Sequence, residues 1–177
     1  PKNRLFMQDS IDEEDRVAFE RLLAKRLNRI PLQHITGTAP FRRIELKVGP
    51  GVFIPRPESE LVAEAAIRFL RECENPIAVD LCSGSGAIAL SPALEVPGAK
   101  VIGVEVSPDS SVWLEHNVKR FVCEIPVEIH QIYATDFTAS VFAKLAGKFD
   151  VATCNPPYIP PRMTPRDPEV LIHEPTV

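Results

Sequence analysis

The sequence predicts an α/β fold in which one parallel sheet is built from alternating strands and helices. From residue 77 onward, short apolar runs alternate with helix-like segments in the order strand, helix, strand, helix, strand, helix, strand. The first run, residues 77–81, leads into a glycine turn at 82–86 and then into the helix-like run 87–90. This alternation is typical of a parallel sheet with right-handed crossovers.

An amphipathic helix is predicted before the sheet. Residues 10–13 (Ser-Ile-Asp-Glu) have the pattern of a capping box, and the helix should run through about Asn28. Its apolar side would comprise Val17, Leu22, Leu23, Leu27 and Ile30. We expect residues 1–38 to be the end of an N-terminal helical domain. Its basic residues would form a solvated face or touch a partner; they are Arg21, Lys25, Arg26 and Arg29.

A β-hairpin is expected next, as a linker over residues 39–58. Ile44, Leu46 and Val48 alternate with polar neighbours, which predicts a hairpin over residues 41–54 with its turn at 49–51 (Gly-Pro-Gly). Ser59 is predicted to cap a helix through about Glu72, ahead of the first core strand. Residues 59–177 would then form the sheet domain. Within it, Pro92 should kink or shorten the helix that follows the glycine turn.

The glycine turn predicts a ligand site. Gly84 and Gly86 would let the backbone approach a ligand, and the following helix presents unpaired N–H groups. Glu105, 19 residues past Gly86, ends a second apolar run. An acidic side chain at this spacing can accept hydrogen bonds from both ribose hydroxyls. A nucleoside ligand is therefore expected, although a doubly wound domain with an empty glycine turn is the alternative.

The chemistry of the turn distinguishes among nucleosides. The dinucleotide fingerprint has a third glycine where this chain has Ala89, and Asp80 at the start of the turn is acidic. A carboxylate at this place repels phosphates and attracts a cation. S-adenosylmethionine carries a sulfonium and an ammonium group and no phosphate, so it fits the turn better than NAD does.

Residues 155–158 (Asn-Pro-Pro-Tyr) directly follow the apolar run 149–154 and predict a second polar site at a strand's end. Pro156 and Pro157 fix φ and remove two N–H donors. The carbonyls of the turn and the side chain of Asn155 can then accept hydrogen bonds from an NH2 group, and Tyr158 offers a flat face to a planar group. An ordinary proline turn that ends a strand is the alternative.

Together these motifs resemble class I S-adenosylmethionine-dependent methyltransferases. Three further stretches narrow the resemblance to the HemK/PrmC family, the release-factor glutamine methyltransferases: residues 31–37 (Pro-Leu-Gln-His-Ile-Thr-Gly) followed by Phe41, residues 53–60 (Phe-Ile-Pro-Arg-Pro-Glu-Ser-Glu), and residues 173–175 (His-Glu-Pro). The Asn-Pro-Pro-Tyr motif alone is shared with adenine-N6 methyltransferases, and its combination with residues 53–60 is more specific.

The resemblance implies N5-methylation of the glutamine in the Gly-Gly-Gln loop of a peptide-chain release factor. It places Asp80, Gly84 and Gly86 along the methionine part of the cofactor, and it makes Cys82, Ser85 and Asn155 further cofactor contacts. It places Glu105 at the ribose, Asp136 and Phe137 at the adenine, and Arg56, Pro57 and Ser59 over the cofactor. The substrate amide would be held by Asn155 and the Pro156 carbonyl, with Pro157 and Tyr158 beside it. Ser59 stands where the family more often has threonine.

The same motifs suggest a mechanism and leave alternatives. No histidine lies in either motif, so we expect catalysis by positioning of the amide rather than by a strong general base. A ribosomal-protein glutamine methyltransferase shares these motifs, and a DNA or RNA adenine methyltransferase also acts on a planar NH2 group. Residues 1–58 carry a charge of +3 and residues 59–177 a charge of −7, without the basic stripe expected of a duplex-binding enzyme. The third alternative is a cofactor-binding remnant without catalysis.

Composition adds further expectations. A chain of 177 residues, 45% of them hydrophobic, can bury one substantial core. It has no apolar run long enough for a membrane span and no signal-peptide core, so a cytoplasmic protein is expected. The four cysteines (73, 82, 123 and 154) lack metal or redox spacing and should be reduced, buried thiols. We expect no metal. Only four strands are predicted where such methyltransferases have seven, so a fragment is expected.

Overall fold

The computed structural model describes residues 11–121, 127–132, 134, 136, 140–158 and 167–175. Its centre is a four-stranded sheet of β3 (Ile77–Leu81), β4 (Lys100–Val104), β5 (Val127–His130) and β6 (Val151–Cys154), in the order β5-β4-β3-β6. All three neighbouring pairs are parallel. The helices α4 (Ala87–Glu95), α5 (Pro108–Phe121) and α6 (Ser140–Leu145) alternate with these strands along the chain, as predicted.

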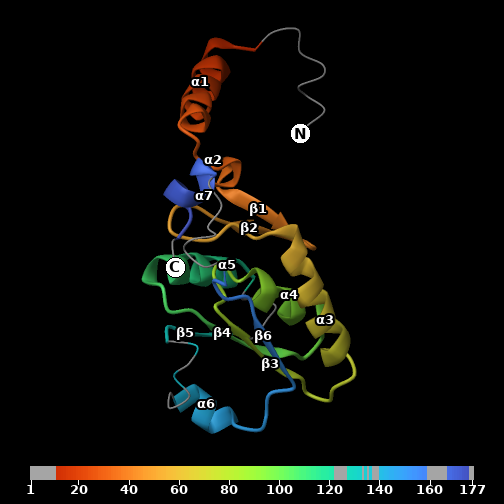
Figure 1. Cartoon of the computed structure of the whole chain (residues 1–177). Coiled ribbons are helices and arrows are strands. Elements are labelled where there is room, and N and C mark those ends of the chain that lie inside the picture. The colour runs from red at the N-terminus through yellow and green to blue at the C-terminus, as the bar shows by residue number, and fades with distance from the viewer. Residues whose placement is uncertain are drawn as a thin grey trace.

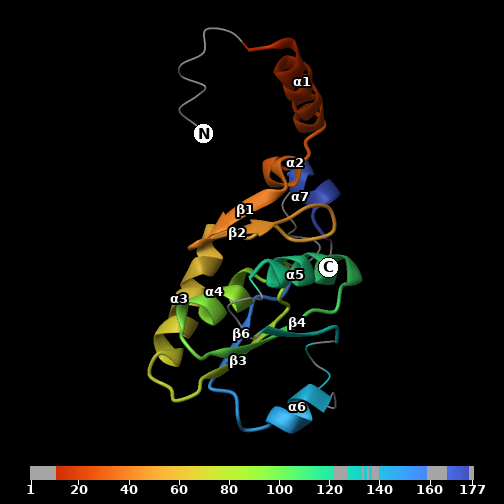
Figure 2. The same cartoon turned by 180° about the vertical axis from the view of Figure 1, so that it is seen from behind.

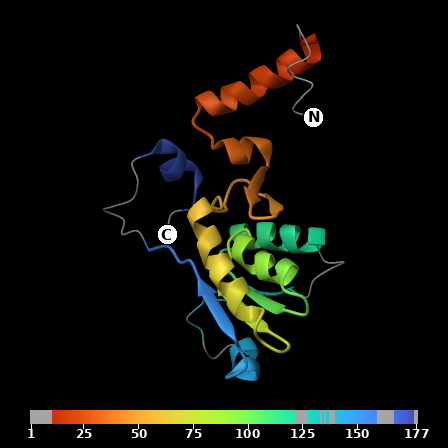
Figure 3. The same cartoon turned by 90° about the vertical axis from the view of Figure 1, so that its right-hand side faces the viewer.

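Helices cover both faces of this sheet (Figures 1 and 3). On one face, Ala78 belongs to a buried cluster with Ile67 of α3 (Glu60–Leu70) and Ala89 of α4. On the other face, Val79 packs with Phe142 of α6. Successive residues of a strand point to opposite faces, so β3 contributes to both layers and is buried between them.

The predicted hairpin is present, but its turn was predicted at the wrong place. β1 (Thr38–Phe41) pairs antiparallel with β2 (Ile44–Lys47), and the chain reverses at residues 42–43 instead of at 49–51. Arg42 adopts a φ of 50°, and its backbone N–H donates to the Glu60 carboxylate at 2.9 Å. A contact with α3 therefore stabilises a turn that lacks glycine. Burial of Leu46 and Val48 agrees with the expected alternation.

The Gly-Pro-Gly segment instead forms a loop fastened to α5. Trp113 Nε1 donates to the Pro50 carbonyl at 3.0 Å, and Ser110 Oγ donates to the Gly51 carbonyl at 3.0 Å. The loop therefore attaches the hairpin to the sheet domain.

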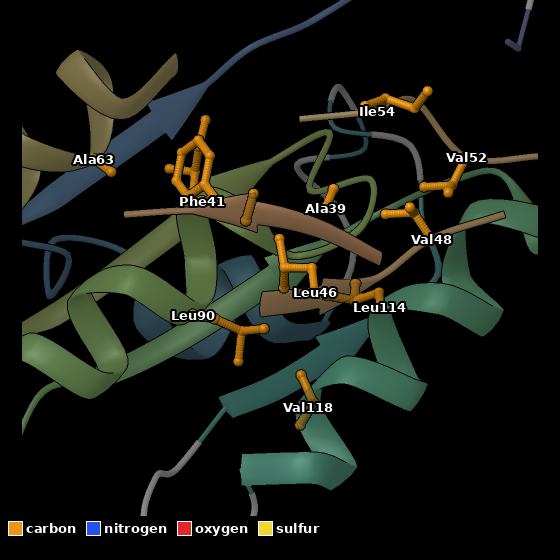
Figure 4. Packing of buried hydrophobic residues seen from close by; sticks show 12 residues of the cluster. Ala39, Phe41, Leu46, Val48, Val52, Ile54, Ala63, Leu90, Leu114 and Val118 are labelled. Carbon is orange, nitrogen blue, oxygen red and sulfur yellow. The ribbon is translucent and has the colours of Figure 1, made fainter. Parts of the chain in front are cut away.

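The hairpin also shares the main core of the molecule. Figure 4 shows Phe41 and Leu46 of the hairpin in one cluster with Leu90 of α4 and Leu114 of α5. These four side chains are almost completely excluded from solvent. Burial of a large apolar side chain stabilises by about 1.5–3 kcal/mol, so the hairpin is an integral layer of the fold.

The N-terminal helix begins later than predicted. α1 (Glu13–Leu27) is capped by Asp12, whose side chain accepts a hydrogen bond from the Asp15 N–H at 2.8 Å. The capping box predicted from Ser10 is therefore wrong, and Ser10 itself lies outside the described residues. Figures 1 and 2 show α1 extending away from the sheet domain. Its predicted apolar side is not buried, and Leu22, Leu23 and Leu27 are exposed.

Two of the basic residues near the end of α1 make contacts with the C-terminal segment. Arg26 Nη1 lies 2.7 Å from the Glu169 carboxylate of α7 (Pro168–His173), and Arg29 lies 3.8 Å from the same carboxylate. The short helix α2 (Leu32–Thr36) follows. These ion pairs connect segments about 140 residues apart in sequence, so Arg26 and Arg29 have structural partners within the chain.

Ser59 does not cap α3 through its side chain, contrary to prediction. Residues Pro57–Ser59 form a single turn of 3₁₀-helix, η2, and α3 follows it directly from Glu60. Pro92 lies inside α4, which ends three residues later at Glu95. Within the described residues, the helices are too short or too polar to cross a membrane.

Candidate functional site

The predicted site residues follow strands whose carboxyl ends lie at one edge of the sheet. The order β5-β4-β3-β6 places β4 and β5 on one side of β3 and β6 on the other. Strands are therefore added on one side of β3 up to β5 and on its other side with β6, and ligands of open α/β sheets bind at such a topological switch point. The glycine turn follows β3 and Asn155 follows β6, so the two predicted motifs lie at this point.

Ser83 fixes the glycine turn to the ends of two strands. Its Oγ donates to the Asp80 carbonyl at 2.8 Å and accepts from the Val104 N–H at 3.1 Å. Its own N–H donates to the Val104 carbonyl at 3.0 Å. The turn is therefore held in one conformation by the backbone of β3 and β4.

The two glycines of the turn have different environments. Gly84 has a φ of 55°, and a Cβ added there would meet no atom within 4 Å. Gly86 has a φ of 86° at the start of α4, and a Cβ there would lie 2.7 Å from Leu114 Cδ1. Gly84 thus leaves the backbone accessible, whereas Gly86 is required for close packing against α5.

Glu105 holds the turn from the β4 side. It is 8% exposed, and its Oε2 accepts a hydrogen bond from the Gly84 N–H at 2.8 Å. Its Oε1 accepts from the Ser107 N–H at 2.9 Å. A carboxylate oxygen has two lone pairs, so each oxygen retains capacity for a ligand hydroxyl.

Asp80 lies beneath the turn, within β3. It is 2% exposed, and its Oδ1 accepts from the Thr153 hydroxyl at 2.7 Å. In the described part of the chain, Oδ2 has no hydrogen-bond partner. Burial raises the pKa of Asp80 to about 7, and the Thr153 hydrogen bond opposes that rise. A buried carboxylate oxygen without a hydrogen-bond partner is costly, and such groups are found more often at functional positions.

Two cysteines flank the switch point. Cys82 has a φ of 60° and is half-buried, and burial raises the pKa of its thiol to about 11. Cys154, expected to be buried, is exposed because it ends the edge strand β6. Cys73 is half-buried, the three described cysteines are free thiols, and Cys123 lies outside the described residues.

Asn155 makes one hydrogen bond that defines the orientation of its amide. The side-chain Nδ2 donates to Ser59 Oγ at 3.2 Å. Oδ1 has no hydrogen-bond partner among the residues that the structure describes. Pro156, Pro157 and Tyr158 are exposed, and the Tyr158 side chain is accessible to a ligand. The predicted acceptor is therefore available next to an exposed ring.

Arg56 connects this region to the C-terminal segment. Its Nη2 lies 2.5 Å from the Glu174 carboxylate, and its guanidinium stacks over Phe53 at 4.8 Å from the ring centroid. Glu174 is 7% exposed; burial raises its pKa, whereas the Arg56 charge lowers it. The structure thus brings together residues 53–60 and 173–175, two stretches of the family resemblance.

Two predicted adenine contacts follow β5. Asp136 is exposed. Phe137 lies outside the described residues, so its predicted role is not addressed by the structure. Ser85 and Gly86 belong to the glycine turn, and Pro57 is the first residue of η2.

Asn117 of α5 is a site residue that sequence reasoning missed. It is fully buried, its Oδ1 accepts from the Lys47 N–H at 2.7 Å, and its Nδ2 donates to the carbonyls of Lys47 and Ser85 at 2.9 Å each. The amide therefore joins β2 to the glycine turn. Its partners are 70 and 32 positions away, so no local pattern could have revealed them.

Surface hollows and possible metal clusters were the other candidates for a ligand site, and they give weaker evidence for one. Two hollows of about 380 and 390 Å³ lie against β5, and their linings do not include the predicted site residues. Within the described ranges, no three His, Cys, Asp or Glu side chains are grouped to hold a metal ion.

The parallel sheet, the switch point and the glycine turn after β3 define a class I methyltransferase fold. The chain is similar to the S-adenosylmethionine-dependent methyltransferase from Agrobacterium tumefaciens, with a TM-score of 0.54 and 20% identity, over 68% of this chain and 39% of that one. It is also similar to the T. thermophilus 16S rRNA N2 G1207 methyltransferase, solved with AdoMet and guanosine, with a TM-score of 0.51 and 27% identity, over 68% of this chain and 32% of that one.

Residues 2–37 match the family model described as PrmC N-terminal domain, and residues 32–171 match the model described as conserved hypothetical protein 95. The chain belongs to the PrmC family, as the sequence motifs predicted. It is 44% identical to the release factor glutamine methyltransferase of Bifidobacterium longum over 89% of this chain, and 43% identical to that of Mycolicibacterium smegmatis over 98%. It spans 55% and 59% of these relatives, a little over half their length.

Proposed function

We propose that the protein transfers a methyl group from S-adenosylmethionine to the side-chain nitrogen N5 of the glutamine in the Gly-Gly-Gln motif of a peptide-chain release factor. The observation that carries this proposal is the placement of the glycine turn and of Asn155 on either side of one switch point. The names of the relatives support the choice of substrate. From a substrate of this kind we also infer a cytoplasmic location.

The chain's residues fit the proposed cofactor. The accessible backbone at Gly84 suits close approach, and Glu105 retains acceptor capacity for ribose hydroxyls. The buried acid Asp80 disfavours phosphate near the turn. Asp136 and Phe137 would contact the adenine. When bound, the cofactor supplies a methyl group made electrophilic by the sulfonium.

The role of Asn155 follows from the weakness of the nucleophile. An amide nitrogen attacks carbon poorly, because its lone pair is delocalised into the carbonyl. Asn155 Oδ1 and the Pro156 carbonyl would both accept hydrogen bonds from the substrate NH2. These acceptors fix the direction of the nitrogen and stabilise the positive charge that develops on it during transfer. Tyr158 and Pro157 would flank the planar amide. The proton then leaves to water.

Methyl-labelled cofactor tests this proposal when offered with three separate acceptors: a release factor, a ribosomal protein and an oligonucleotide. We expect label on the release factor and none on a release factor whose Gly-Gly-Gln glutamine is replaced by alanine. Asn155→Ala should abolish the label while cofactor affinity stays within about twofold, since the proposed contact is with the substrate. Label on the ribosomal protein or on nucleic acid alone would overturn the choice of substrate.

A further inference from the structure

Ser59 occupies the N-cap position of α3 but makes no capping hydrogen bond through its side chain, so its hydroxyl is available for another contact. The structure gives it that contact with Asn155, at 3.2 Å and across 96 positions of sequence. The resemblance implies that Ser59 lies over the cofactor, and the structure shows in addition a hydrogen bond to the proposed catalytic amide.

The orientation of an asparagine amide decides what it can bind. One end of the amide accepts hydrogen bonds, and the other end only donates them. A substrate NH2 group is itself a donor, so it can form a hydrogen bond with Oδ1 of Asn155 but not with Nδ2. Rotation of the Asn155 amide by 180° would therefore remove the proposed acceptor from the site.

Ser59 is placed so that it can hold the favourable orientation. Its Oγ accepts from Nδ2, which turns Oδ1 away from Ser59. The turn that carries Ser59 is itself anchored: the Ser59 N–H donates to the Arg56 carbonyl at 3.0 Å, and Arg56 pairs with the buried Glu174. Pro57 fixes φ at the start of this turn. The acceptor is therefore set before any substrate arrives.

We propose that Ser59 is a positioning residue that holds the Asn155 amide with Oδ1 directed at the substrate nitrogen. The inference rests on the proposed function and deepens it. A preset acceptor needs no reorganisation during methyl transfer, and this is the main advantage of an ordered polar site. Threonine would serve equally, because it carries the same hydroxyl.

Kinetics test the proposal with three variants. Ser59→Ala should lower kcat about tenfold, the effect expected for loss of one hydrogen bond, while the affinity for S-adenosylhomocysteine measured by calorimetry stays unchanged. Ser59→Thr should keep the wild-type kcat. Ser111→Ala removes a buried hydroxyl that lacks a partner among the described residues, and it should leave kcat unchanged. A Ser59→Ala variant that loses cofactor affinity and keeps kcat would overturn the proposal.

The side-chain NH2 signal of Asn155 provides a readout that does not depend on activity. This signal can be assigned in isotope-labelled protein by its absence in Asn155→Asp. Ser59→Ala should shift it and speed its exchange with solvent, and Ser59→Thr should not. An unchanged signal in Ser59→Ala would overturn the inference about Ser59, whereas wild-type protein that methylates none of the three acceptors would overturn the proposed function.

Discussion

Leu114 Cδ1 lies where a side chain at Gly86 would have to be: an added Cβ would be 2.7 Å from it. Gly86→Ala should therefore destabilise the protein by about 1 kcal/mol for its positive φ and by a further 1–3 kcal/mol, roughly, for the steric overlap. Urea unfolding of the wild type and the variant measures the total loss in the free energy of unfolding.

Gly98→Ala is the matched control for this prediction. Gly98 has a φ of 80°, but a Cβ there would meet no atom within 4 Å. Gly98→Ala should therefore lose only the stability that a positive φ costs an alanine, about 1 kcal/mol. Equal losses of stability in the two variants would contradict the packing role of Gly86.

Asn117 should tolerate no change of its amide group. Asn117→Asp has nearly the same shape, yet a carboxylate cannot donate to the carbonyls of Lys47 and Ser85. The variant would bury an uncompensated charge against two acceptors, and we expect a loss of about 3 kcal/mol or more in the free energy of unfolding. The same exchange at Asn28, which is exposed, should change the stability by less than about 1 kcal/mol.

Elements with strong periodicity could be predicted from the sequence, and so could the ends of strands. Residues 77–81 were assigned as a strand and form β3, because a run of apolar residues before a glycine turn has few other structures available. Glu105 and Asn155 were located for the same reason, since each follows such a run. These predictions depend only on neighbours in sequence.

Features that depend on tertiary contacts could not be predicted. The hairpin turn was assigned to Gly-Pro-Gly, although Arg42 makes the turn because Glu60 binds its backbone N–H. Ser59 was assigned as a cap, although its hydroxyl contacts Asn155. Thr153 gave a weak signal, as a polar residue within an apolar strand. Its partner Asp80, 73 positions away, could be identified only in three dimensions.

Arg42 should contribute more to stability than its neighbour Arg43. Arg42 Nε donates to Glu95 at 2.8 Å and Nη2 donates to Glu64 at 2.7 Å, and its side chain is 14% exposed. Loss of one partner from a buried ion pair leaves the other charge uncompensated, so Arg42→Ala should cost about 3 kcal/mol. Arg43 is 82% exposed and lies 3.8 Å from Glu95. Arg43→Ala should therefore lower the free energy of unfolding by less than about 0.5 kcal/mol. Similar losses at both positions, measured by urea unfolding, would contradict this.

The raised pKa of Asp80 makes stability depend on pH near neutrality. Its pKa of about 7 in the folded state exceeds the ordinary value of 3.8, so the folded state holds the proton more tightly than the unfolded state does. The free energy of unfolding should therefore fall as the pH rises from about 4 to about 7. Above about pH 7 it should stay at the lower value, because Asp80 is then ionised in both states. Asp80→Asn mimics the protonated form and removes this titration.

Thermal unfolding of wild-type protein and Asp80→Asn at pH 5 and pH 8 tests that prediction. The wild-type Tm should fall between the two pH values by more than the variant's Tm does, because other groups titrate alike in both proteins. Glu95 does not interfere, since its pKa is lowered by Arg42 and its contribution is lost only in more acidic solution. A parallel fall in both proteins would mean that Asp80 is already ionised at pH 5, with Thr153 and the turn compensating its charge.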